Sequence, residues 1–145
     1  MISIQSITSE NLDAVLNLSV YEDQRGYVST TAESLAQAYV YQDTAFPFAI
    51  YDDETIVGFI MMGYYKEKEY YTLWKLLIDK DHQNKGYGRK ALELGIAFLK
   101  ENYQVKEIYT GVSPGNDVAK KLYESVGFQE TGLFENNMLE LRLRL

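Results

Sequence analysis

The sequence predicts a single α/β (α+β) domain, with a mixed, mostly antiparallel sheet and helices on both of its faces. The chain has 145 residues, the size of one ordinary domain, with no linker, internal repeat or low-complexity stretch. Segments with the period-two alternation of strands are interleaved with segments whose apolar residues recur every three or four positions, as in helices. We therefore expect residues 1–145 to fold as one unit.

The N-terminal half begins with an alternating strand, followed by helix-start residues at Thr8–Asn11 and an apolar helical stripe. After Pro47 the pattern changes to strands, which are separated by polar turns at Asp52–Glu54 and Lys66–Lys68. The expected elements are a strand over 2–7, helices over 12–18 and 31–41, and strands over 48–51, 55–65 and 69–78.

The C-terminal half has two helices, each preceded by a strand. The first of these helices begins at Gly86, and the second ends before Gly127, which occupies the usual C′ position. A turn at Glu135–Asn137 joins the last two strands. The expected elements are helices over about 86–100 and 116–126, and strands over 107–112, 128–134 and 138–145.

Composition excludes several classes of function. The chain has no Cys, which removes thiolate nucleophiles and thiolate metal sites, and its single His, His82, rules out a His-rich metal site. The net charge of −7 argues against nucleic-acid binding, and no apolar run approaches the ~18 residues of a membrane span. With no visible secretion signal, we expect a cytoplasmic protein without a metal. The acidic charge suits a cationic small substrate, and also simple solubility.

One glycine-containing loop has the features of an anion site. Gln83-x-x-Gly86-x-Gly88 follows a predicted strand and leads into a helix, whose first amides have no partner within the helix. Together with the helix dipole, these amides suit a pyrophosphate, and Lys85, Arg89 and Lys90 add positive charge. Taken alone, the pattern fits an ordinary structural turn equally well.

A second segment removes part of that ambiguity. Val112-x-x-x-Asn116-x-x-Ala119-x-x-Leu122-Tyr123-x-x-x-Gly127-Phe128 follows a strand and ends at a helix stop. Together with the Gln83–Gly88 loop, it resembles the GNAT superfamily of N-acetyltransferases, and the resemblance covers nearly the whole chain. It implies a sheet of about seven strands, splayed in the middle and flanked by four helices. It also implies acetyl-CoA as the cosubstrate.

The resemblance assigns roles residue by residue. Tyr123 matches the general acid that protonates the departing sulfur, although a core tyrosine also explains its place on the helix. Asn116 matches the Asn beside the pantetheine arm, and also suits a helix N-cap. The cofactor-binding residues implied are Leu76, Leu77, Ile78, Gln83, Asn84, Lys85, Gly86, Tyr87, Gly88, Arg89, Asn116 and Tyr123.

The strand that ends at Ile78 matches the central strand of the family, which splays from the next one so that pantetheine fills the gap. A bulge near Leu77 and Ile78 would produce this splay. An amine with a pKa near ~10 must first lose a proton. It would then attack the thioester directly in a ternary complex, with the Ile78 backbone N–H as the oxyanion donor.

The acceptor is less well defined. The chain is most similar to the small bacterial spermine/spermidine acetyltransferases, but Lys75 and Thr72 depart from that pattern. Carboxylates and aromatic faces suit a polyamine. The candidates in the sequence are Glu22, Asp23, Tyr27, Glu69 and Trp74, with Tyr70 and Tyr71 beside them. Glu22 and Asp23 also suit a solvated acidic loop.

Other functions stay open. The acceptor could be a protein N-terminus, an amino acid or an aminoglycoside, or the domain could bind acetyl-CoA without turnover; a proton donor at Tyr123 argues against the last. The general base is unassigned, with water relayed to Glu22, Asp23 or Glu69 as one route, and His82 is interpreted as a solvated loop residue. A homodimer is the habit of the family.

Overall fold

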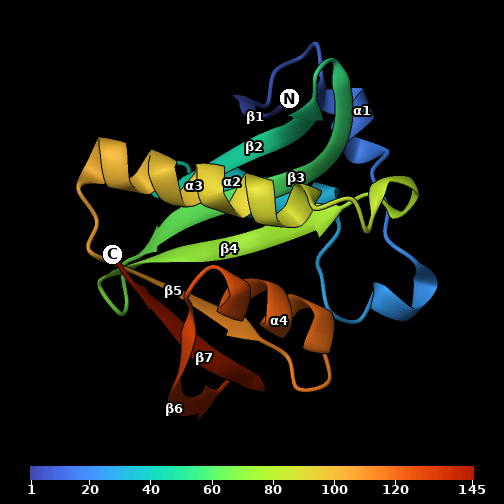
Figure 1. Ribbon diagram of the computed structural model, residues 1–145. Helices are drawn as coiled ribbons and strands as arrows, with labels where there is room; N and C mark the ends of the chain where they lie inside the picture. Colours follow the sequence, from blue (N-terminus) through green and yellow to red (C-terminus); the bar gives the residue numbers. More distant parts are fainter.

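The computed structural model describes residues 1–145 (Figure 1). It contains seven strands, four α-helices and two short 3-10 helices, and the two 3-10 helices are labelled η1 and η2. The strands are β1 (Ile2–Ser6), β2 (Ala45–Asp52), β3 (Thr55–Tyr65), β4 (Tyr70–Ile78), β5 (Glu107–Val112), β6 (Gln129–Glu135) and β7 (Met138–Arg144). The helices are α1 (Leu12–Leu16), η1 (Glu22–Gln24), α2 (Thr31–Val40), η2 (Lys80–His82), α3 (Tyr87–Tyr103) and α4 (Asp117–Ser125).

All seven strands belong to one sheet with the order β1-β2-β3-β4-β5-β7-β6. Every neighbouring pair is antiparallel except β4 and β5, which are parallel. This confirms the predicted mixed sheet with four helices. None of the helices is both long and apolar enough to cross a bilayer.

The parallel pair separates soon after it forms. β4 and β5 pair only at Tyr71–Ile108 and Thr72–Tyr109. The buried Thr110 then donates its hydroxyl to the Leu73 carbonyl at 3.0 Å, where a backbone bond would otherwise follow. In Figure 1 the two strands begin together near the C-terminus and diverge toward the start of α3. The predicted splay is therefore present.

The bulge lies elsewhere than predicted. Leu77 and Ile78 stay in regular register with β3, whereas the register shifts between Met61–Lys75 and Met62–Leu73. The extra residue is therefore Trp74, and the expectation of a bulge near Leu77 and Ile78 is wrong. The neighbouring strand β3 accommodates the bulged residue. Gly63 leaves room for the indole, because a Cβ there would lie 2.8 Å from a Trp74 ring carbon.

The two faces of the sheet carry separate cores. The larger core joins α3 and the C-terminal strands, with Ile60, Leu92 and Ile108 fully buried. The smaller lies under α1 and α2 and includes Val15 and Phe59. Each such side chain contributes roughly 1.5–3 kcal/mol by leaving water.

Element boundaries differ from the prediction where packing overrides local pattern. α1 ends at Leu16 instead of Leu18, and α3 continues to Tyr103, whose ring stacks on Phe46 with centroids 5.1 Å apart. β2 begins before Pro47, which lies beyond the last pairing of β1 with β2. Gly127 has a φ of +111°, as its predicted C′ position requires.

Gly58→Ala should lower the free energy of unfolding by about 2–3 kcal/mol, because the new Cβ would meet the backbone oxygen of Leu77 far inside van der Waals contact. Gly26→Ala is the control, since nothing lies within 4 Å of a Cβ there. Urea denaturation of both variants tests this expectation. Equal free energies of unfolding for the two variants would show that the backbone of β4 at Leu77 shifts at little cost.

Candidate active site

Two cavities share β4 as a wall. The α3–α4 cavity, of about 290 Å³, lies where β4 ends and both helices begin, and the β4–β7 cavity, of about 640 Å³, lies across the diverging strands. Residues 76–78 line the first, and residues 72–75 line the second. One continuous strand therefore connects the two spaces.

The Gln83–Gly88 loop brings backbone amides to the α3–α4 cavity. Asn84 and Gly86 both have left-handed backbones, with φ of 63° and 80°, and Gly86 occupies the N-cap of α3 without a capping side chain. The first amides of α3 are thus left without an intrahelical acceptor. This geometry is compatible with the predicted anion site, which stays a prediction.

Gly86 and Gly88 are required in this loop for different steric reasons. Gly86 supplies the positive φ, and open space lies where its Cβ would be. A Cβ at Gly88 would lie 3.3 Å from Leu122, so its absence lets α3 begin close to α4. The Tyr87 hydroxyl donates to Asp52 at 2.6 Å, and this bond holds the pKa of the Asp52 carboxyl below its usual range.

Gln83 holds the loop to β4. Its amide nitrogen donates to the Ile78 carbonyl at 3.0 Å, and its side chain forms a two-way amide pair with Gln24 at 2.9 and 3.0 Å. Gln24 therefore joins η1 to the candidate cofactor loop. The sequence analysis missed Gln24, because no local pattern marks a contact over 59 residues.

The end of β4 directs polar backbone toward the gap. The Asp79 N–H donates to Val57 on β3 at 2.9 Å, so the N–H groups of Ile78 and Leu76 point to the opposite side, where β5 has diverged. The Ile78 carbonyl is occupied by Gln83. The Ile78 N–H therefore faces the open gap, and its role as oxyanion donor stays a prediction.

Tyr123 lies between the core and the α3–α4 cavity. Its side chain is 9% exposed, packs against Phe128 with ring centroids 6.0 Å apart, and lines the cavity. Burial raises its pKa to about 12, because the phenolate would lose solvation. The hydroxyl thus stays protonated across the physiological range, as a proton donor requires.

Asn116 is the N-cap of α4 by position, but its side chain makes no capping hydrogen bond. It lines the same cavity as Tyr123. The amide therefore stays available to a ligand. All the predicted cofactor residues line this cavity apart from Lys85, which is exposed beside it.

The predicted acceptor residues are not brought together. Trp74 lines the β4–β7 cavity, whereas Tyr27 lines the α3–α4 cavity. Glu22, Asp23 and Glu69 are exposed and line neither. The sequence also places His82 in open solvent, but it is half-buried and lines the α3–α4 cavity.

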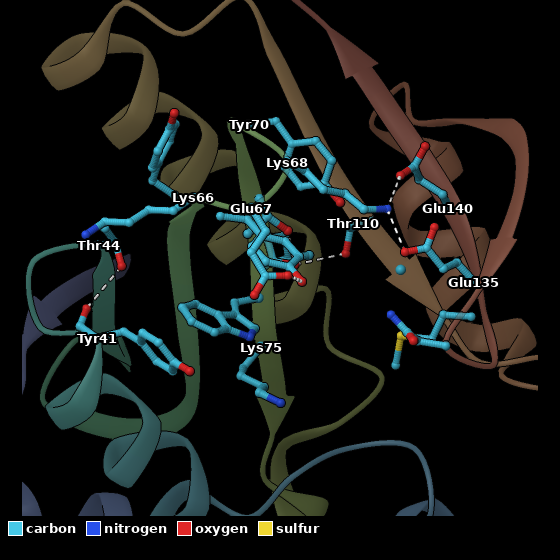
Figure 2. Close-up of a pocket in the computed structure, with 18 of the residues that line it drawn as sticks. Tyr41, Thr44, Lys66, Glu67, Lys68, Tyr70, Lys75, Thr110, Glu135 and Glu140 are labelled. Carbon is cyan, nitrogen blue, oxygen red and sulfur yellow. Dashed lines mark hydrogen bonds and ion pairs between the residues drawn. The ribbon is translucent and has the colours of Figure 1, made fainter.

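The β4–β7 cavity contains other groups that suit a cationic amine (Figure 2). Its carboxylates come from the β3–β4 and β6–β7 hairpins, and its aromatic side chains come from the C-cap of α2, from β3 and from β4. These residues are Glu67, Glu135, Glu140, Tyr41, Tyr64, Tyr65, Tyr70 and Trp74. Glu135 and Glu140 were missed, because the last hairpin reaches this cavity only when β7 pairs with β5. No three His, Cys, Asp or Glu side chains converge as metal ligands.

The splayed parallel pair and the uncapped start of α3 are the arrangement that the resemblance to the GNAT superfamily implies. The chain matches the Acetyltransferase (GNAT) family over residues 12–128 and belongs to it. It is an N-acetyltransferase, of a family that uses acetyl-CoA. It is 32% identical to a spermine/spermidine N(1)-acetyltransferase from Bacillus subtilis, over 94% of this chain and 93% of that protein.

Solved structures share the fold. A spermidine N-acetyltransferase from Vibrio cholerae in complex with CoA and spermine has a TM-score of 0.75 at 18% identity, covering 97% of this chain and 92% of its own. An aminoglycoside acetyltransferase in complex with coenzyme A has a TM-score of 0.81 at 16% identity, covering 99% and 95%. At these identities the likeness concerns the fold, which does not distinguish the acceptors.

Tyr123→Phe should change how stability depends on pH. The folded protein keeps this phenol protonated to about pH 12, whereas the unfolded chain releases the proton near pH 10. The stabilisation is complete below pH 10 and is lost as pH rises toward 12. Between pH 8 and 11, the free energy of unfolding should fall by about 1 kcal/mol more in the wild type than in Tyr123→Phe. Parallel pH curves in urea denaturation would contradict the raised pKa.

Proposed function

We propose that the protein transfers an acetyl group from acetyl-CoA to a primary amine of a polyamine, by direct attack in a ternary complex. The observation that carries the proposal is the position of β4 between two cavities of opposite character. One presents backbone amides suited to a pyrophosphate, and the other presents carboxylates and aromatic faces suited to a cationic amine.

The cofactor would lie along the α3–α4 cavity. Its pyrophosphate would bind the amides from about Lys85 to Arg89, and its pantetheine arm would take the backbone positions of β4 that β5 leaves unpaired. Asn116, which has no capping bond, would hydrogen-bond the arm. The thioester would then lie near Tyr123 and the Ile78 N–H.

The chemistry needs no covalent enzyme intermediate. The neutral amine attacks the thioester carbonyl carbon, so a C–N bond forms and charge moves to the oxygen, where the Ile78 N–H stabilises it. Collapse breaks the C–S bond and leaves the electron pair on sulfur. Tyr123 gives its proton to the sulfur and is reprotonated through solvent by the proton released from the new amide nitrogen. The products are an N-acetylated amine and CoA.

The raised pKa of Tyr123 is compatible with this role. A free thiol has a pKa near ~8.5, so a phenol with a pKa of about 12 would be a weak donor to a solvated thiolate. Burial acts on both groups, however, and raises the pKa of a thiolate enclosed beside the phenol as well. The transfer therefore requires a sulfur that leaves beside the buried phenol, within the α3–α4 cavity.

The acceptor panel is the direct test. Spermidine and spermine should give a kcat/KM at least about tenfold above those of an N-terminal peptide, an amino acid and an aminoglycoside. A thiol-reactive dye measures this without protein background, because the chain has no Cys. If the aminoglycoside or the peptide has the highest kcat/KM, the proposal that the acceptor is a polyamine is wrong.

Tyr123→Phe should lower kcat by about 10²-fold or more and leave the Kd for acetyl-CoA within about twofold. Single-turnover kinetics and calorimetric titration measure the two quantities. Tyr39→Phe is the control, since Tyr39 is 76% exposed. An unchanged single-turnover rate would leave Tyr123 with a packing role only.

A further inference from the structure

Lys68 holds the carboxylates at one end of the β4–β7 cavity. Its ammonium lies 3.1 Å from Glu135 Oε1 and 4.0 Å from Glu140 Oε2 (Figure 2). The Thr131 hydroxyl donates to the other oxygen of Glu140 at 2.8 Å, which leaves Oε2 for the ammonium. The turn between β3 and β4 thus supplies a cation to a site built by β6 and β7.

Aromatic rings complete this site. Tyr70 lies beside Lys68 in Figure 2 and stacks on Tyr109, with ring centroids 4.1 Å apart and planes at 11°. Tyr65 meets Tyr70 edge-on, with centroids 5.9 Å apart. Carboxylates beside aromatic faces suit an alkylammonium, and the end of a lysine side chain is itself one.

Gln37 is an independent sign that the cavity receives a hydrogen-bond donor. Its Oε1 is buried without a hydrogen-bond partner, and the residue lines the β4–β7 cavity with Tyr41 and Trp74. A buried acceptor without a donor is costly and uncommon in native proteins. An N–H of a bound amine would satisfy it.

Building on the proposed function, we propose that the far ammonium of an elongated acceptor displaces Lys68 from Glu135 and Glu140. Lys68 then acts as a built-in competitor that occupies the distal cation subsite until a substrate with a second cationic group arrives. The cavity lining is neutral at rest, with Lys66, Lys68 and Lys75 against its three glutamates. Release of the partly exposed Lys68 side chain into solvent leaves a net negative subsite.

Fluorescence of Trp74 tests this directly. Trp74 is the only Trp of the chain and lines the cavity, so its emission reports binding without acetyl-CoA and without turnover. Lys68→Met should lower the Kd for spermidine about three- to fivefold, the equivalent of one partly exposed ion pair. The Kd for butylamine, which has one ammonium, should stay within about twofold.

Two further variants distinguish loss of the Lys68 ion pairs from a general loss of positive charge. Lys66→Met removes the same charge from the same turn but frees no carboxylate, because Lys66 has no ion pair, and should tighten spermidine binding less. Adding Glu140→Gln to Lys68→Met should reverse the gain. Equal effects of Lys66→Met and Lys68→Met, or no spermidine binding by the wild type, would overturn the inference. If spermidine binds the wild type and the variants shift its Kd as expected, but spermidine is not acetylated, the proposed function is overturned and the inference about Lys68 stands.

Discussion

Pairing between β4 and β5 stops after Thr72 and Tyr109, and the site depends on this interruption. A strand inside a sheet has to satisfy its backbone groups. Here Thr110 takes the Leu73 carbonyl and Gln83 takes the Ile78 carbonyl, while the remaining groups face the gap. The gap allows α4 to bring Tyr123 and Asn116 to the end of β4, and it opens the opposite face to the second cavity.

Local chemistry explains why most of the fold was predictable. Gly127 ends α4, and the left-handed Asn136 and Asn137 form the last turn, because few other residues adopt these conformations at low cost. The position of the bulge was not predictable in this way. It depends on Gly63, a residue of the neighbouring strand, making room for Trp74. The sequence of β4 by itself does not indicate where the bulge lies.

The candidate site also has one part that depends on local sequence and another part that depends on contacts between distant segments. The loop from Gln83 to Arg89 is contiguous, and its candidate anion site depends on its own backbone conformation, so the sequence could indicate it once the downstream Asn116 and Tyr123 were included. The β4–β7 cavity is assembled from two hairpins, in which Lys68 meets Glu135 only after β7 has paired with β5. Glu22 and Asp23 had the right chemistry, but they lie on an exposed turn that the chain holds near the cofactor loop through Gln24.

The two sides of β4 suit opposite charges by different means, and this lets them lie close together in a protein with a net charge of −7. Fixed backbone dipoles at the start of α3 favour an anion, whatever carboxylates surround them. The cation side uses full charges instead, which Lys68 balances in the free protein. Carboxylates neutralised in this way exert little repulsion on an incoming pyrophosphate. In the proposed complex, Glu135 and Glu140 become available to a cation only when Lys68 leaves, so binding of the amine would not require a standing negative charge near the cofactor.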